Sequence, residues 1–270
     1  MKKYTVILTI AGSDSSGGAG IQADLKTIEA LGGFGVSVIT AITAQNTQGV
    51  RGIHPIPTEM IQQQFEAIAE DIEIAALKTG MLHNSQTIET IVDCIKKFNI
   101  KKVVVDPVMV STSGHILIEN DTINILKNKL FPLATIITPN IDETEILLDR
   151  KIKKMQDMEK AAMDLTKLGC QCALVKGGHL PYEDLVDTYY NIQSKKIQNI
   201  KSKKIDTINT HGTGCTLSAA IATELGKNKN IDIAIHNAHK YLYDALLSGK
   251  NYKLGKGFGP LHHSHQFYKD

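Results

Sequence analysis

The feature that most constrains the fold of this sequence is a repeated alternation of short β-rich runs and amphipathic segments. In the amphipathic segments the apolar residues recur with the period of a helix, whereas the short runs are rich in Val, Ile and Thr. Run and segment alternate at residues 4–10 and 21–31, 35–43 and 58–68, 74–79 and 84–98, 103–105 and 122–130, and 134–138 and 140–148. A helical pattern at 158–168 then precedes a run at 173–175, and helical patterns at 215–225 and 231–247 end the series. This alternation is typical of a parallel sheet covered by helices, so we expect a doubly wound α/β fold.

Two of the predicted strands are apolar on both faces. The chain reads Val-Val-Val at 103–105 and Thr-Ile-Ile at 135–137. A strand without a polar face is expected where helices cover both sides of a sheet. The sequence has no linker rich in Pro, Gly or Ser and no internal repeat, and 42% of its 270 residues are apolar. We therefore predict a single domain over residues 1–270.

Charge and hydropathy argue against two classes of partner. The formal net charge is only +2, which is too small for a nucleic-acid surface. We interpret the lysine-rich stretch 201–204 as a solvated turn rather than a binding patch. The longest apolar run falls far short of the roughly 20 residues that a membrane-spanning helix needs, so no membrane association is expected.

The cysteines indicate a reducing compartment. Cys94, Cys170, Cys172 and Cys215 lie in unrelated contexts without a C-x-x-C pair, which disfavours a disulfide framework and a zinc site. We therefore expect a cytoplasmic protein. The histidines at 262–265 suggest a metal, but the carboxylate and cysteine ligands of such a site are not nearby in the sequence.

The first run leads into a glycine-rich turn at residues 12–20, where a parallel sheet would bind a ligand. Gly12 and Gly17 have the spacing of a Walker phosphate loop, but Gly18-Ala19 stands where that loop has Lys-Ser/Thr. Asp14 would also repel a pyrophosphate within the turn. The turn is therefore predicted to hold something other than phosphate.

A second glycine-bearing stretch, at 209–215, precedes a strong helical pattern and has no carboxylate. Gly212 and Gly214 allow close approach of the backbone, and Thr213 adds a hydroxyl group. The N–H groups and the dipole of the following helix would favour an anion here. An ordinary helix start with a threonine cap is the alternative.

Eight motifs run in order through the chain, at residues 12–26, 44–47, 78–81, 106–109, 138–143, 176–179, 209–215 and 259–263. Together they resemble the hydroxymethylpyrimidine/phosphomethylpyrimidine kinases of thiamine biosynthesis. The likeness covers nearly the whole chain. That family has the ribokinase-like fold, a doubly wound, mostly parallel sheet with helices on both faces, which agrees with the alternation above.

The resemblance implies transfer of the ATP γ-phosphoryl group to the hydroxymethyl oxygen of 4-amino-5-hydroxymethyl-2-methylpyrimidine, and then a second transfer that makes the diphosphate. Gly212, Thr213 and Gly214 would supply the anion hole. Cys215 would be the catalytic base, because this subgroup has cysteine where many ribokinase-like enzymes have aspartate. A helix N-terminus lowers a thiol pKa and would make a thiolate accessible. A buried, inert cysteine is the alternative.

The resemblance also implies the residues that bind ATP and magnesium. Lys176 would bring a cation to the ATP phosphates, although it could equally be a solvated lysine at a strand end. Asn140 and Glu143 lie one helical turn apart and would hold Mg²⁺ through water. Asn140 could instead be a helix cap.

Six residues are implied to surround the pyrimidine: Gly12, Ala19, Asp24, Gln45, Met81 and Val108. The small Gly12 and Ala19 would let the ring approach the backbone, and Asp24 would accept a hydrogen bond from the substrate unless it is only a first-turn acid. The amide of Gln45 offers a donor beside an acceptor, which matches a ring nitrogen flanked by an amino group. Met81 and Val108 would form apolar walls, or else belong to the core.

Two other functions fit parts of the pattern. A pyridoxal or pyridoxine kinase could use the same scaffold, but Gln45 disfavours it because pyridoxal-active relatives tend to have an apolar residue there. A catalytically silent vitamin-binding or nucleotide-binding protein would have no need of Cys215. The family also leads us to expect a homodimer, although the sequence has no exposed apolar stripe that proves an interface.

Overall fold

The computed structural model describes residues 2–109, 120–178 and 184–268. Its nine-stranded sheet has the order β3-β2-β1-β4-β5-β6-β7-β8-β9. The strands are β1 (Val6–Ser13), β2 (Phe34–Asn46), β3 (Gly49–Pro55), β4 (Ala76–Thr79), β5 (Val103–Val105), β6 (Ile136–Ile137), β7 (Cys172–Val175), β8 (Asp184–Asn191) and β9 (Lys196–Lys203). The six strands β2, β1, β4, β5, β6 and β7 pair in parallel in that order. The pairs β2–β3, β7–β8 and β8–β9 are antiparallel. The predicted mostly parallel sheet is confirmed.

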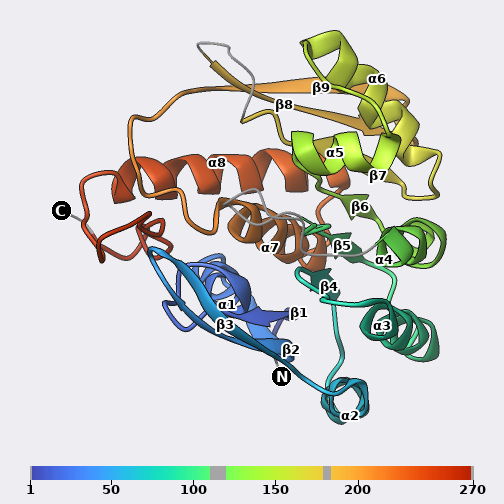
Figure 1. The fold of residues 1–270 in the computed structure, drawn as a ribbon. Helices are drawn as coiled ribbons and strands as arrows, with labels where there is room; N and C mark the ends of the chain where they lie inside the picture. The colour runs from blue at the N-terminus through green and yellow to red at the C-terminus, as the bar shows by residue number, and fades with distance from the viewer. Residues whose placement is uncertain (1, 110–119, 179–183, 269–270) are drawn as a thin grey trace.

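Helices cover both faces of this sheet (Figure 1). The helices are α1 (Gly20–Ala30), α2 (Thr58–Ala69), α3 (Ser85–Lys97), α4 (Asn120–Ile125), α5 (Ile141–Leu148), α6 (Met155–Thr166), α7 (Thr213–Gly226) and α8 (Ile231–Gly249). One core lies between the sheet and α1, α7 and α8, and the other lies between the sheet and α2 to α6. Within β5, Val104 packs into the first core while Val103 and Val105 pack into the second. This division explains why that strand has no polar residue.

The predicted runs and segments coincide with strands and helices, with one change of helix type. The segment predicted as a helix at 122–130 begins as α4 and continues as a π-helical turn at Leu126–Leu130 and a 3-10 turn at Phe131–Leu133. Pro132 stands within that last turn, where its missing N–H prevents an α-helical continuation.

Three antiparallel strands were not predicted. Every residue of β3 is exposed, and exposed residues recur throughout β9. The strands β3 and β9 therefore lack the continuous apolar run that identifies a buried strand, whereas β8 is largely buried but contains polar residues such as Asp187 and Thr188. The prediction of a solvated turn at 201–204 was wrong for Lys201 and Lys203, which belong to β9 at the sheet edge. Lysines on an edge strand discourage pairing with another sheet.

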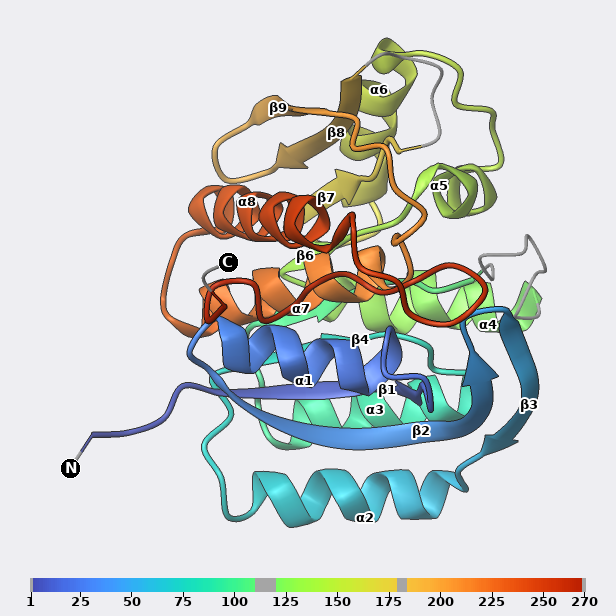
Figure 2. The ribbon, with the colours of Figure 1, turned by 90° about the vertical axis from the view of Figure 1, so that its left-hand side faces the viewer.

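The antiparallel ribbon of β2 and β3 curls toward the C-terminal segment (Figure 2). At the tip of the ribbon, the carbonyl of Thr47 accepts a hydrogen bond from the N–H of Phe258 at 3.0 Å. The C-terminal segment continues past the start of α7, where Pro260 pairs with His211. These contacts close the ribbon over the carboxyl end of β1. No helix in the described part of the chain has the length and apolarity needed to cross a membrane.

Candidate active site

The glycine-rich turn after β1 is organised by the carboxylate of Asp14. This carboxylate accepts hydrogen bonds from the backbone N–H groups of Ser16 at 2.8 Å, Gly18 at 3.2 Å and Ala19 at 2.8 Å. Burial opposes its ionisation, but hydrogen bonds from His211, Ser16 and Ala19 hold the pKa of Asp14 well below its usual range. The donors that a phosphate would need are thus already bound to a negative charge. This explains in physical terms why the turn is not a phosphate loop.

The start of α7 packs directly against this turn. Gly212 has φ of +86°, and a Cβ there would overlap the carbonyl oxygen of Gly18. A Cβ on Gly214 would lie 3.2 Å from the ammonium nitrogen of Lys176 and 3.4 Å from Oδ2 of Asp106. The predicted anion-binding turn and the predicted lysine are therefore neighbours. One phosphate could then contact both the N–H groups at the helix start and the ammonium group.

Lys176 is charged and anchored by Asp106. Its Nζ lies 2.9 Å from Oδ1 of Asp106, which also accepts a hydrogen bond from the hydroxyl of Thr138 at 3.2 Å. Burial works against both charges, but the attraction of Lys176 and Lys78 lowers the pKa of Asp106, and the attraction of Asp106 and Glu143 raises that of Lys176. Asp106 was not among the predicted site residues. Its position directly after a buried strand was the available signal.

Asn140 and Glu143 form a capping box at the start of α5. Oδ1 of Asn140 accepts a hydrogen bond from the N–H of Glu143, and Oε2 of Glu143 accepts one from the N–H of Asn140, both at 2.8 Å. The side-chain oxygen of Asn140 thus caps the helix, which is the alternative stated for it. That Asn140 and Glu143 hold Mg²⁺ through water stays a prediction. Burial raises the pKa of Glu143 to about 7, Lys176 opposes this, and Asp106 adds to it. The two carboxylates that share the charge of Lys176 are therefore Asp106 and Glu143.

Cys215 occupies the first turn of α7 with its thiol in a charged environment. Burial raises the pKa of Cys215 to about 11, and Asp24 and Asp106 add to this increase. The ammonium of Lys78 and the backbone N–H of Gly20 act in the opposite direction. The prediction of a lowered thiol pKa was wrong, because desolvation exceeds the effect of the helix terminus. Burial therefore favours the thiol form of Cys215 over the thiolate.

Asp24 forms a fully buried ion pair with Lys78. The ammonium lies 2.8 and 3.0 Å from the two carboxylate oxygens, and the hydroxyl of Thr9 donates a third hydrogen bond at 2.6 Å. Neither charged side chain has exposed surface. The prediction that Asp24 binds substrate directly was therefore wrong, since it lies on the buried face of α1. Lys78 was not among the predicted site residues, although a lysine inside a buried strand was a signal for it.

Gln45 lies at the end of β2 and contacts the loop before α7. Its carboxamide oxygen lies 3.2 Å from Oγ1 of Thr43, and its nitrogen lies 3.3 Å from Nε2 of His211. That same ring nitrogen is 2.8 Å from the carboxylate of Asp14. Gln45 is therefore joined through His211 to the turn that contains Ala19.

Gly12 and Met81 meet on the other side of that turn. A Cβ on Gly12 would collide with the terminal methyl group of Met81, and one on Gly20 would overlap the carbonyl oxygen of Gly12. The contact at Gly20 is with backbone and its φ is +57°, so this position requires glycine. At Gly12 the Met81 side chain would have to move to accommodate a Cβ.

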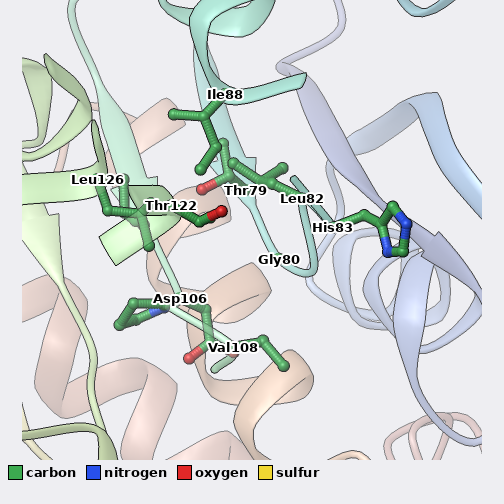
Figure 3. A pocket seen from close by; sticks show the side chains of 11 residues that line it. Thr79, Gly80, Leu82, His83, Ile88, Asp106, Val108, Thr122 and Leu126 are labelled. Carbon is green, nitrogen blue, oxygen red and sulfur yellow. The ribbon is translucent and has the colours of Figure 1, made fainter. Parts of the chain in front are cut away.

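Val108 lines a small pocket between the ends of β4 and β5 (Figure 3). The hydroxyls of Thr79 and Thr122 lie at this pocket, together with Leu82 and Asp106. Among the described residues, Oγ1 of Thr79 is buried without a hydrogen-bond partner. Val108 and Asp106 therefore line the same pocket. The other five residues predicted to surround the pyrimidine do not line it.

Comparison with known proteins gives concordant results. The family model for phosphomethylpyrimidine kinase matches residues 14–262. The hydroxymethylpyrimidine/phosphomethylpyrimidine kinase of Rhizobium meliloti is 43% identical over 266 residues, which cover 98% of this chain and 99% of that protein.

Two solved structures have the same fold. The ADP complex of Bacillus subtilis pyridoxal kinase is 37% identical with a TM-score of 0.91, covering 99% of this chain and 100% of that one. The phosphomethylpyrimidine kinase of Clostridium difficile is 43% identical with a TM-score of 0.80, covering 89% of this chain and 99% of that one.

Proposed function

The chain belongs to the phosphomethylpyrimidine kinase family, and on that premise we propose how its residues perform the reaction. It is an ATP-dependent phosphotransferase that phosphorylates 4-amino-5-hydroxymethyl-2-methylpyrimidine and then the resulting monophosphate for thiamine biosynthesis. Residues 1–270 act as one catalytic domain. The observation that carries the phosphoryl-transfer site is the proximity of the Lys176 ammonium to Gly214 in the first turn of α7.

The transferred phosphoryl group would bind at the start of α7. The first N–H groups of a helix have no partners within the helix, so those of Gly214 and Cys215 are available to its oxygens. Lys176 adds a full positive charge at the same place. Phosphoryl transfer depends mainly on such positioning and charge stabilisation.

Asp106 and Glu143 would hold Mg²⁺, since carboxylate oxygens are its preferred protein ligands. The raised pKa of Glu143 supports this assignment. Burial destabilises its ionised form, and a cation bound beside the carboxylate would stabilise that form. Bound Mg²⁺ would neutralise charge on the ATP phosphates. Asn140 contributes by orienting Glu143 through the capping box.

Cys215 would take the proton of the substrate hydroxyl group. Only its thiolate form can do so. Burial disfavours that form and Lys78 favours it, so Cys215 would act through the minor thiolate population. Replacing Cys215 with Ala should lower kcat by about 100-fold or more and leave the affinity for the pyrimidine nearly unchanged. Turnover at the wild-type rate would remove Cys215 from the mechanism.

Gln45 would recognise the aminopyrimidine edge, and Gly12, Ala19 and Met81 would border the ring. This assignment is supported by the contacts that bring Gln45 beside the turn containing Ala19. Val108 would contribute apolar surface from the neighbouring strand end.

Pyridoxal kinase activity is the second candidate, because a pyridoxal kinase shares the whole fold at 37% identity. ADP formation should be measured with ATP, Mg²⁺ and either the aminopyrimidine alcohol or pyridoxal. We expect kcat/KM to be larger for the aminopyrimidine. Equal values would contradict the proposed specificity, and no ADP with either alcohol would indicate a binding protein.

The protein would act as a homodimer in the cytoplasm. Three apolar side chains on the β2–β3 ribbon are about half exposed, Ile42 at 51%, Val50 at 49% and Ile53 at 43%, and an exposed apolar patch favours association. The four cysteines are free thiols, as expected in a reducing compartment.

A further inference from the structure

The carboxamide of Gln45 is held between two groups whose protons can be assigned. On one side is Thr43, whose hydroxyl lies 2.7 Å from the carbonyl oxygen of Ser13 and 3.2 Å from the carboxamide. On the other side is His211, whose Nε2 lies 2.8 Å from the carboxylate of Asp14 and 3.3 Å from the carboxamide. Each group therefore contacts Gln45 and one further acceptor.

The proton of His211 is fixed by Asp14. The Asp14 carboxylate is ionised, because His211, Ser16 and Ala19 lower its pKa against the opposing effect of burial. A carboxylate only accepts hydrogen bonds, so Nε2 of His211 must carry a hydrogen atom. That hydrogen atom is directed to Asp14, the nearer acceptor, and Nε2 has no lone pair left to accept a hydrogen bond from Gln45. An N–H of Gln45 would have no acceptor there, so the carboxamide atom beside Nε2 must be the oxygen.

The proton of Thr43 is fixed by Ser13. A hydroxyl group has one hydrogen atom, and the carbonyl of Ser13 is its nearer acceptor. Thr43 can then only accept from Gln45, so the carboxamide atom beside it must be the NH₂ group. Both ends thus require the same orientation, with oxygen toward His211 and nitrogen toward Thr43, which a half-turn of the terminal amide provides.

We propose that Asp14 and His211 are positioning residues that set the polarity of the Gln45 carboxamide and thereby select an aminopyrimidine edge. In this orientation the oxygen keeps one lone pair and the nitrogen keeps one hydrogen for a ligand. They match a ring with an amino donor beside an unprotonated ring nitrogen. A ring with a carbonyl oxygen beside a ring N–H has its acceptor and donor in the opposite order. In the same position its oxygen would face the oxygen of Gln45 and its N–H would face the N–H of Gln45, so neither pair could form a hydrogen bond.

This inference rests on the proposed function, because it assumes that Gln45 contacts the substrate ring. The test compares kcat/KM for the 4-amino pyrimidine alcohol with that for its 4-oxo analogue. Wild-type enzyme should prefer the amino compound by about 100-fold, since two mispaired groups separate the substrates. His211→Phe keeps a planar ring but removes the N–H donor, so the preference should fall to about tenfold or less.

Two further variants make the experiment specific. Thr43→Val removes the acceptor on the other side of the carboxamide and should reduce the preference in the same way. Ser15→Ala is the matched control, because the Ser15 hydroxyl contacts the backbone N and O of Gln45, at 2.9 and 2.8 Å, rather than its amide group. Its preference ratio should equal that of the wild type.

The outcomes separate this inference from the proposed function. If wild-type enzyme phosphorylates neither pyrimidine, the proposed function fails. If it prefers the amino compound and both His211→Phe and Thr43→Val retain that ratio, the positioning role is overturned. A folded His211→Phe enzyme should also bind ADP within about twofold of wild type. A lower preference for the amino compound with unchanged ADP affinity would show that the substitution affects Gln45 rather than the start of α7.

Discussion

The most unusual single residue is Lys78, a lysine without exposed surface whose partner Asp24 is equally buried. Breaking a buried ion pair is costly because it leaves one group without its partner. Lys78→Met should therefore reduce the free energy of unfolding by about 3–5 kcal/mol, measured by urea denaturation. The double variant Lys78→Met/Asp24→Asn should recover much of this loss, and a single-variant loss under about 1 kcal/mol would contradict the importance of the pair.

The thiol of Cys215 should react slowly at neutral pH, because burial raises its pKa to about 11. Only the thiolate is alkylated, so the rate of reaction with iodoacetamide should rise about tenfold per pH unit between pH 7 and 9. Cys215→Ala identifies the signal, since the other three cysteines are buried. A plateau below pH 8 would mean that the thiol is activated in the free enzyme.

His263 gives the fold a defined sensitivity to acid. Burial lowers its pKa to about 4 from 6.5, and Nε2 lies 3.0 Å from the hydroxyl of Thr216. The folded state thus favours the neutral ring, so its contribution to stability is complete above pH 6.5 and is lost as the pH falls toward 4. The change amounts to roughly 3 kcal/mol. His263→Gln should flatten the decline in the unfolding free energy over this range, and an unchanged slope would contradict it.

Individual roles were predictable only in part, because a residue type does not reveal what its side chain contacts. Lys176 and the turn at Gly212 were predicted as neighbours of one ligand, and the structure does bring them together. The carboxylate of Asp24 could accept a hydrogen bond from a substrate, but α1 directs it toward Lys78 instead. The raised pKa of Cys215 depends on burial by distant segments, which no local pattern contains.

At the scale of elements, the start of α7 depends on a residue without a side chain. Gly212 has φ of +86° and approaches the carbonyl oxygen of Gly18 too closely for a Cβ. Gly212→Ala should therefore displace α7 from the turn and weaken ATP binding by about tenfold or more, since strain of 1–3 kcal/mol is introduced. Calorimetric titration with ATP checks this.

Gly178→Ala is the matched control for that titration, since a Cβ at this position meets no atom of the described residues within 4 Å. It should bind ATP as the wild type does. If Gly212→Ala also retained wild-type affinity, the phosphate would not depend on this helix start.

The elements that were predictable are those whose burial leaves a periodic pattern. The parallel strands are buried on both faces, and β5 coincides with its predicted bounds at Val103–Val105. The antiparallel strands β3 and β9 depend on pairing with distant partners and lie at the sheet edges. Their exposed side chains need not be apolar, so sequence periodicity missed them.

At the scale of the whole molecule, the exposed ribbon of β2 and β3 is the surface on which the homodimer would form. Ile53 contributes half-exposed apolar surface to it. Ile53→Glu would place a charge in a buried interface and should convert the dimer to a monomer, as light scattering coupled to gel filtration would reveal. Lys2→Glu, in the exposed N-terminal segment, is a charge-changing control. A wild-type monomer, or an Ile53→Glu dimer, would refute this assignment.

The sequence motifs meet at one edge of the sheet because parallel strands all end there. The turn after β1, the residues after β5 and β7, and the start of α7 lie far apart in the sequence. Nevertheless Asp14, Asp106 and Lys176 each contact or approach the segment that begins α7. The topology was predictable, and with it this convergence. The contact of the C-terminal segment with Thr47 was not predictable, because it depends on backbone N–H groups that donate to the carbonyl and the hydroxyl of Thr47.

The central claim is that the start of α7 and Lys176 receive the transferred phosphoryl group while Gln45 holds the pyrimidine ring. A crystal structure with a non-hydrolysable ATP analogue and the aminopyrimidine alcohol tests it most directly. The account predicts the terminal phosphate within hydrogen-bond distance of the Gly214 N–H and the Lys176 ammonium, with the ring edge against Gln45. A terminal phosphate bound instead at the turn of Asp14, or a ring bound away from Gln45, would contradict it.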